Sequence, residues 1–153
     1  YSGTYRRPTM ASPALTLLAP VPEHSPRIAA PSAPSVPVAR LDADMEVLER
    51  LRVAARRARA GRQTSLADAM SVLQCPGAAA GAAEALVRVL GEMIGRRPVF
   101  HAPGCRFASF DEAWLMRAHQ AQRARDVDSL ALLTGRRLPG AMRRPFLDLL
   151  RAI

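Results

Sequence analysis

The sequence predicts an all-α fold, with five or six short helices in one compact bundle preceded by a proline-rich, disordered tail. Apolar residues recur at helical spacing from Leu41 onward, prolines crowd the first 40 residues, and no segment shows a convincing strand alternation. A chain of 153 residues is long enough for one domain with a hydrophobic core and too short for two ordinary domains. We therefore expect a flexible tail over residues 1–40 and one helical domain over residues 41–153.

The tail is predicted from its proline density. Eight of the 13 prolines lie in residues 1–40, and Ser and Ala fill most of the gaps. Proline fixes φ and lacks an amide donor, so neither a helix nor a central strand forms at this density. Two overlapping Pro-x-x-Pro spacings, from Pro31 to Pro37, arise readily in such sequence, and we interpret the segment as a spacer with polyproline II character.

The first predicted helix runs from Leu41 to about residue 60 and stops at Gly61. Its first turns are acidic and its last turns are rich in arginine, which is the polarity that the helix dipole favours. The second starts at the N-cap Ser65, with Asp68 three residues on, and stops at residues 75–77. The residues of these two helices that are expected to face the protein core are Leu41, Met45, Leu48, Leu51, Ala55, Ala58, Leu66, Ala69, Met70 and Leu73.

The third predicted helix covers about 79–94, where Gly91 indicates close contact with a neighbouring backbone and Gly95 is placed as a C-terminal cap. Its expected core residues are Ala82, Leu86, Val89, Leu90 and Met93.

Ser109 and Glu112 form a capping box for a fourth helix that reaches about residue 125. A fifth helix is predicted from Asp126 to Thr134, and a sixth from Pro145, a residue that suits a first helical position. The core residues expected in the sixth helix are Phe146, Leu149, Leu150 and Ile153. The aromatic residues near the fourth helix, expected to pack in the core, are Phe100, Phe107, Phe110 and Trp114.

The basic residues are all arginine, and the net charge is +9. A GC-rich coding sequence explains the absence of lysine, but a patch of arginines still binds phosphate or carboxylate through its two-pronged guanidinium. The residues predicted to contact an acidic partner or a nucleic acid are Arg52, Arg56 and Arg59, on one face of the first helix, and Arg96 and Arg97.

One segment raises the question of a metal. His101 and Cys105 flank a Pro-Gly turn, and Cys75 and His119 would complete a tetrahedral zinc site with two nitrogen and two sulfur ligands. A strong structural site has two closely spaced ligand pairs, and this set has one. The alternative is that Cys105 is a small buried residue, that His101 hydrogen-bonds a helix end, and that the turn pins the third helix against the fourth.

No catalytic residues are predicted. The sequence contains no glycine-rich phosphate loop, no HExxH and no GxSxG, and Asp111 and Glu112 are explained by capping in a first helical turn. A catalytic Cys105 would need an orienting group beyond His101 and Arg106 that the sequence does not reveal. We expect neither an enzyme nor a small-molecule substrate, and no cofactor unless zinc binds.

Part of the chain resembles a family of small helical alphaproteobacterial proteins with no assigned function, over roughly residues 75–153. The motifs that carry the resemblance are Gly95-Arg96-Arg97-Pro98, His101-x-x-Gly104-Cys105-Arg106 and Asp111-Glu112-Ala113. Members have a further Cys where Phe107 stands and Gly-Asp where Arg125-Asp126 stands, and the missing Cys weakens the metal hypothesis. The resemblance implies a bacterial helical domain and nothing about activity.

The leading hypothesis is a non-catalytic binding or adaptor module, with regulation as one role, that docks on a protein partner. The alternative is a nucleic-acid-associated regulator that uses arginine-rich faces, although few aromatic residues offer a stacking platform. A zinc-binding helical domain is the second alternative. No run of apolar residues is long enough to cross a membrane, and prolines interrupt the apolar stretch after Arg6-Arg7, so we expect a cytoplasmic location.

Overall fold

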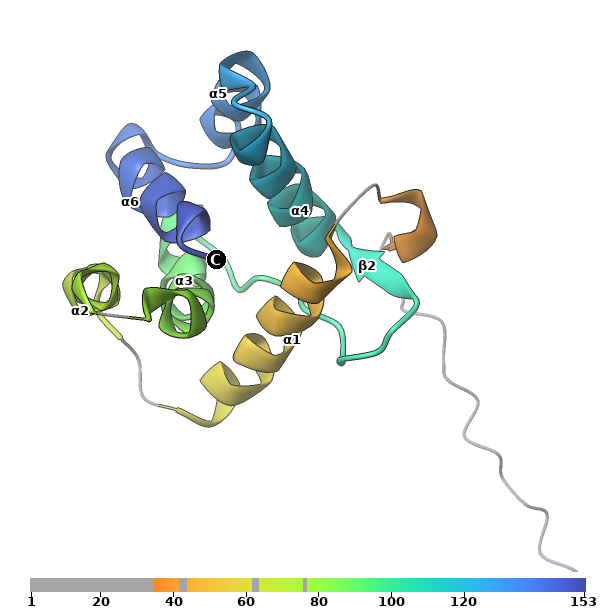
Figure 1. Cartoon of the computed structure of the whole chain (residues 1–153), viewed down its shortest axis with the longest axis horizontal. Helices are drawn as coiled ribbons and strands as arrows, with labels where there is room; N and C mark the ends of the chain where they lie inside the picture. Colours follow the sequence, from red (N-terminus) through yellow and green to blue (C-terminus); the bar gives the residue numbers. More distant parts are fainter. Residues whose placement is uncertain (1–34, 42–43, 62–63, 76) are drawn as a thin grey trace, which may run out of the picture. The chain divides into compact units, whose positions relative to one another are not determined.

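The structure is a computed structural model of the whole chain, and it describes residues 35–41, 44–61, 64–75 and 77–153, without the side chains of residues 78–80. Residues 1–34 of the tail predicted over residues 1–40 lie outside the described residues. The described part contains six α-helices, which confirms the predicted all-α class (Figure 1). Their bounds are Met45–Ala60 (α1), Leu66–Ser71 (α2), Ala78–Ile94 (α3), Phe110–Arg123 (α4), Val127–Gly135 (α5) and Gly140–Arg151 (α6). Among these residues, no helix has the length and apolar character to cross a membrane.

The helix ends follow the capping residues read from the sequence. Ser65 and Ser109 each form a capping box, with Asp68 and Glu112 as the respective third residues. Gly95 ends α3 in the left-handed conformation, with φ of 69°. Asp44 caps α1 by accepting hydrogen bonds from the amides of Glu46 and Val47, so the helix begins at Met45 and not at Leu41. The second predicted helix is interrupted, because α2 is followed by a 3-10 turn, Val72–Gln74.

The start predicted for the last helix at Pro145 is wrong. α6 begins at Gly140, and Pro145 lies inside it. Pro139 precedes the helix, and its carbonyl accepts a hydrogen bond from the Met142 amide at 2.9 Å, which closes the first turn five residues earlier than expected. Pro145 lacks the amide that would bond to the Ala141 carbonyl, so α6 tolerates the loss of one internal hydrogen bond.

A small antiparallel sheet accompanies the helices. Strand Ser35–Pro37 (β1) pairs with strand Phe107–Ser109 (β2), with Val36 opposite Ala108. A 3-10 turn, Val38–Arg40, follows β1, and the Val38 side chain is buried against the helical core. Residues 35–40, which the sequence assigns to the tail, therefore belong to the folded unit. Each strand has three residues, too few to show the alternation by which a strand is recognised in sequence.

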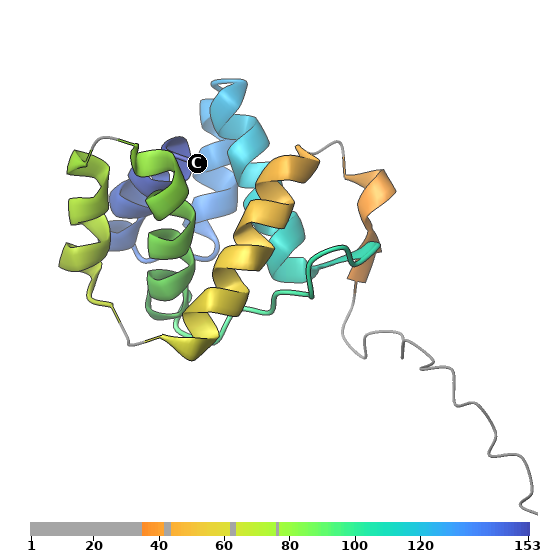
Figure 2. The ribbon, with the colours of Figure 1, turned by 60° about the horizontal axis from the view of Figure 1, so that its bottom comes forward.

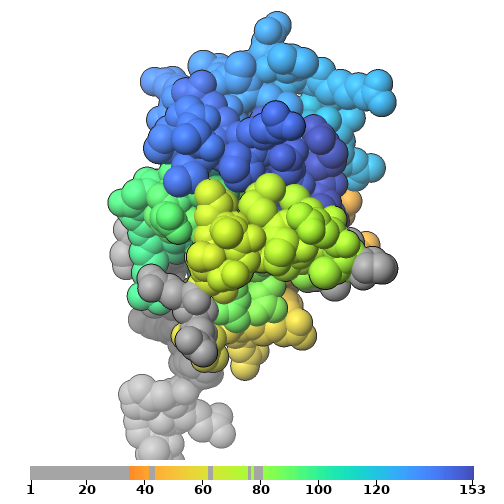
Figure 3. All heavy atoms as spheres, turned by 90° about the vertical axis from the view of Figure 1, so that its left-hand side faces the viewer, coloured from red at the N-terminus to blue at the C-terminus, as the bar shows by residue number. Residues whose placement is uncertain are grey.

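The core lies where α3 meets its neighbours. α1 and α6 pack on α3, and α4 packs on α5 (Figures 1 and 2). Figure 3 shows the face on which α2 lies beside α6. The completely buried apolar side chains include the predicted residues Leu48, Leu51, Leu86, Leu90, Phe146, Leu149 and Leu150.

Three predicted core residues are exposed. Met45 is 45% exposed, Phe107 41% and Phe110 62%. Phe100 and Trp114 are buried as expected, and the Trp114 ring stacks on Phe146 with centroids 5.1 Å apart. Phe107 and Phe110 lie on the outer side of the segment that turns from β2 into α4. Their aromatic character alone therefore does not predict burial.

Candidate functional site

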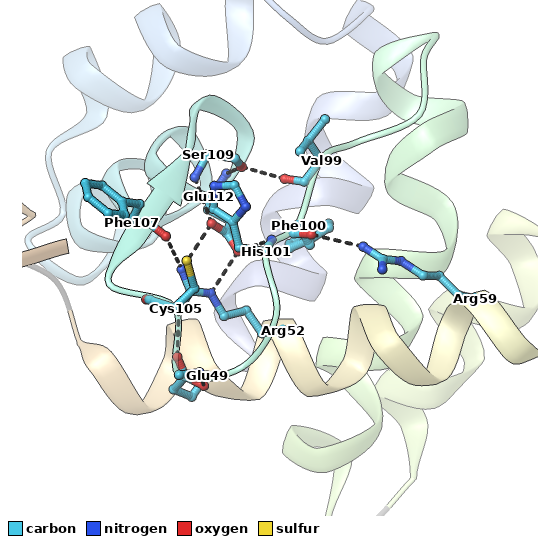
Figure 4. A network of polar contacts seen from close by, with 11 residues as sticks. Glu49, Arg52, Arg59, Val99, Phe100, His101, Cys105, Phe107, Ser109 and Glu112 are labelled. Carbon is cyan, nitrogen blue, oxygen red and sulfur yellow. Dashed lines mark hydrogen bonds and ion pairs between the residues drawn. The ribbon is translucent and has the colours of Figure 1, made fainter. Parts of the chain in front are cut away.

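A buried salt bridge joins α1 to α4 beside the Pro-Gly turn (Figure 4). Arg52 Nε donates to Glu112 Oε1 at 2.9 Å, and Nη2 donates to Oε2 at 3.2 Å. Both side chains are 0% exposed. Paired guanidinium and carboxylate groups at this geometry form two parallel hydrogen bonds, which is the strongest arrangement available to them.

Every donor of the Arg52 guanidinium has an acceptor. Nη1 donates to Glu49 Oε1 at 2.8 Å and to the Cys105 carbonyl at 2.9 Å, and Nη2 also donates to the Phe107 carbonyl at 2.7 Å. Burial lowers the pKa of Arg52, but hydrogen bonds and charge interactions with Glu112 and Glu49 outweigh it, so the pKa is raised. The predicted role of Arg52 as a partner contact is therefore wrong, because five N–H groups are already used inside the fold.

Glu112 organises the backbone around the same salt bridge. Its Oε1 accepts from the His101 amide at 2.9 Å, and its Oε2 accepts from the Ser109 amide at 2.8 Å. The carboxylate does more than cap α4, which is all that the sequence indicated. Together with Arg52 it holds the extended segment between α3 and β2 against both helices.

The Pro-Gly turn is held on α1. The Cys105 amide donates to the Ala102 carbonyl at 3.1 Å, and Gly104 has φ of 79°, which a turn with glycine at its third position requires. The Gly104 amide donates to Glu49 Oε2 at 2.9 Å. The turn thus contacts α1 through Glu49 and Arg52, whereas the expectation was that it pins the third helix to the fourth.

The four predicted zinc ligands are not gathered into one site. Cys75 is exposed at the end of the 3-10 turn after α2, and Cys105 is partly buried in the turn on α1. His119 is 8% exposed within α4. Within the described ranges, no group of three or more His, Cys, Asp or Glu side chains has a metal-binding arrangement.

The two histidines have different surroundings. His101 Nε2 is buried without a hydrogen-bond partner among the described residues. Burial lowers the pKa of His119, the positive charges of Arg123 and Arg50 lower it further, and Asp44 opposes the shift.

Asp111 connects three parts of the domain. Its carboxylate, 2% exposed, pairs with Arg96 from the segment after α3 and with Arg137 from the segment after α5. Oδ2 also accepts from the Val99 amide at 2.8 Å. Burial raises the pKa of Asp111, but the hydrogen bonds from the two arginines and the amide lower it by more, so the pKa is below its usual value. The Arg137 guanidinium also lies 4.6 Å from the centroid of the Trp114 ring.

An open groove of about 800 Å³ lies between the C-terminal half of α1, α3 and the segment 95–100. We call it the arginine groove. Its most buried lining residues are apolar, namely Ala55, Val87 and Phe100. Its basic lining residues are Arg59, Arg88, Arg96 and Arg97, and Glu92 is the single acidic residue among its described lining residues.

Three of the five predicted contact arginines line this groove. Arg59 and Arg97 are exposed, and the Arg96 side chain is 47% exposed. Arg56 is exposed on α1 but does not line the groove. Arg88, which the sequence analysis did not select, joins them because it lies on α3 opposite Gly61, where its guanidinium fills the space that a side chain would occupy. The i,i+4 spacing of Glu84 and Arg88 is typical of an ion pair on a helix surface, which these residues form, and it gives no sign of a groove.

No family model, curated protein or solved structure matches this chain. The resemblance to the alphaproteobacterial family therefore stays an expectation.

Proposed function

We propose that this protein is a non-catalytic binding module that docks on an acidic protein partner. The observation that carries the proposal is the arginine groove, in which four arginines and one glutamate surround a buried apolar base. Guanidinium groups that are exposed at the edge of an apolar depression suit a partner surface with carboxylates around an apolar residue.

The distribution of charge over the rest of the molecule supports the same function. The most buried carboxylates, Asp111 and Glu112, are already paired with arginines inside the fold. Exposed arginines outnumber exposed carboxylates over the described residues. The unbalanced positive charge is therefore on the surface, where it attracts an acidic partner and accelerates encounter at low salt.

The proposal is tested by purifying the tagged full chain from its native cells, with and without nuclease, and then rebuilding the complex from purified components. We expect one acidic protein in stoichiometric amount that survives nuclease and forms a complex with the pure chain on size exclusion. Its affinity should fall as salt rises from 50 to about 300 mM, since exposed charges are screened over about 10 Å at 0.1 M. DNA or RNA released by nuclease, with no protein retained, would instead establish nucleic-acid binding.

A further inference from the structure

The arginine groove has the size of a site for a few side chains. A volume of about 800 Å³ lies within the range of ligand pockets and is too small for a folded domain. Its buried base consists of Ala55, Val87 and Phe100, each less than 8% exposed. An apolar side chain placed there would bury its surface against these three residues, which stabilises the complex by the hydrophobic effect.

Three of the arginines around this base, Arg59, Arg96 and Arg97, are exposed at the groove. The Arg97 side chain makes no hydrogen bond or ion pair with the other residues that the structure describes. Arg59 uses Nη2 to bind the Phe100 carbonyl at 3.0 Å, which holds the rest of its guanidinium beside the groove. Arg96 is held by Asp111 through one edge while its side chain remains 47% exposed. These positions favour a ligand that lies along the segment 95–100 and carries carboxylates.

The aromatic residue of the groove does not suit nucleic-acid bases. Single-stranded nucleic acid binds by stacking its bases on exposed aromatic rings beside a basic groove. Phe100 is 6% exposed, and the exposed Phe107 and Phe110 do not line the groove. The combination of a buried apolar base with arginines therefore favours a protein segment over a nucleic acid.

We propose that the arginine groove binds a short acidic segment of the partner, with one apolar side chain on Phe100 and carboxylates on Arg59 and Arg97. This proposal rests on the proposed function and specifies the part of the partner that is recognised. It also predicts that binding depends on both the charge and the open space of the groove.

Labelled peptides test the proposal by fluorescence anisotropy with the full chain. The probe is a nine-residue peptide of Glu and Asp with a central Leu, compared with a version in which Gln and Asn replace the acids and a version with Ser at the centre. We expect saturable binding of the first peptide, at least about tenfold weaker binding of the uncharged one, and intermediate binding of the Ser version. Equal binding of the Leu and Ser versions would overturn the apolar anchor.

Two groove variants and a matched control locate the site. Arg97→Glu should weaken peptide binding by about tenfold or more, because it reverses an unpaired charge in the groove. Gly91→Leu should also weaken peptide binding, because the leucine side chain would fill the groove. The backbone should tolerate the change, since a Cβ at Gly91 would lie 3.5 Å from the Arg96 carbonyl oxygen and from Pro98, which is ordinary contact. Arg117→Glu, an exposed arginine on α4 outside the groove, carries the same charge change and should bind nearly as well as the original chain.

Thermal melting of each variant shows that the fold is retained. If Arg97→Glu and Arg117→Glu weaken binding equally, the peptide senses net charge and the groove assignment is wrong. If a thymidine oligonucleotide of matched length displaces the peptide at equal concentration, the site recognises polyanions in general and the proposal also fails. If the groove variants still form the complex with the purified partner, the docking function stands and the groove is not its site.

Discussion

Arg52 lies on the same helix as Arg56 and Arg59 but has a different role, because its guanidinium is enclosed. The heptad-like spacing of these arginines predicted one basic face. In the structure, Arg52 faces Glu112 and the carbonyls of Cys105 and Phe107, which lie 53 to 60 residues away in the chain. A periodic pattern within α1 cannot reveal partners contributed by another segment, so this role was not visible in the sequence.

Replacing Arg52 tests its structural role. Arg52→Met should lower the free energy of unfolding by about 3–5 kcal/mol, because Glu112 would remain buried without its positive partner. Arg56→Met, at an exposed position on the same helix, should change it by less than about 0.5 kcal/mol. Urea unfolding followed by circular dichroism at pH 7 measures both, and a loss below about 1 kcal/mol for Arg52→Met would contradict the role assigned to the salt bridge.

The helices illustrate what local sequence determines and where it fails. The N-cap at Ser65, the capping box at Ser109 and the glycine end at Gly95 were predicted because each depends on residues a few positions apart. The predicted start of α6 was wrong because proline is common in the first turn of a helix and rare in its interior. The first turn of α6 lies before Pro145, and its Met142 packs against the core.

Pro145 should therefore limit the stability of α6. Pro145→Ala restores an amide that can donate to the Ala141 carbonyl, and we expect the free energy of unfolding to rise by about 1–3 kcal/mol. Thermal melting monitored by circular dichroism measures the change. A suitable control is Pro139→Ala, at the N-cap position where no internal hydrogen bond is gained. A fall in stability for Pro145→Ala would contradict this expectation, because it would mean that losing the packing of the proline ring costs more than the added hydrogen bond contributes.

At the scale of the whole folded unit, Asp111 connects segments that the helices alone would leave separate. It binds Arg96 after α3, Arg137 after α5, and the amide of Val99. The sequence placed Asp111 in a first helical turn and explained its carboxylate by capping. The two arginines come to it only because α3, α4 and α5 are packed together.

The ionisation of Asp111 should make the fold sensitive to acid. Its pKa is lowered in the folded state, so its contribution to stability is complete above the unfolded value of 3.8 and is lost as pH falls through the lower folded value. Asp111→Asn should lower the free energy of unfolding by about 3 kcal/mol at pH 7, and its stability should change less than that of the original chain below pH 4.

Urea unfolding at pH 7, 4 and 3 measures this dependence. The control is Asp148→Asn, because Asp148 forms surface ion pairs at 3.7 and 4.0 Å that contribute less than about 1 kcal/mol. Parallel pH curves for the original chain and Asp111→Asn would contradict the role of the ionised carboxylate.

The sequence by itself determined the helical class, most helix ends and most of the core stripes, since these depend on propensity, capping and periodicity within a few turns. It also predicted a contact role for Arg59, Arg96 and Arg97, and all three line the arginine groove. Only the tertiary structure decided that Arg52 is internal, that Phe107 and Phe110 are exposed, and that Arg88 joins the groove. The physical reason is the same in each case. Whether a charge is paired, or a ring is covered, depends on segments far apart in the chain that only folding brings into contact.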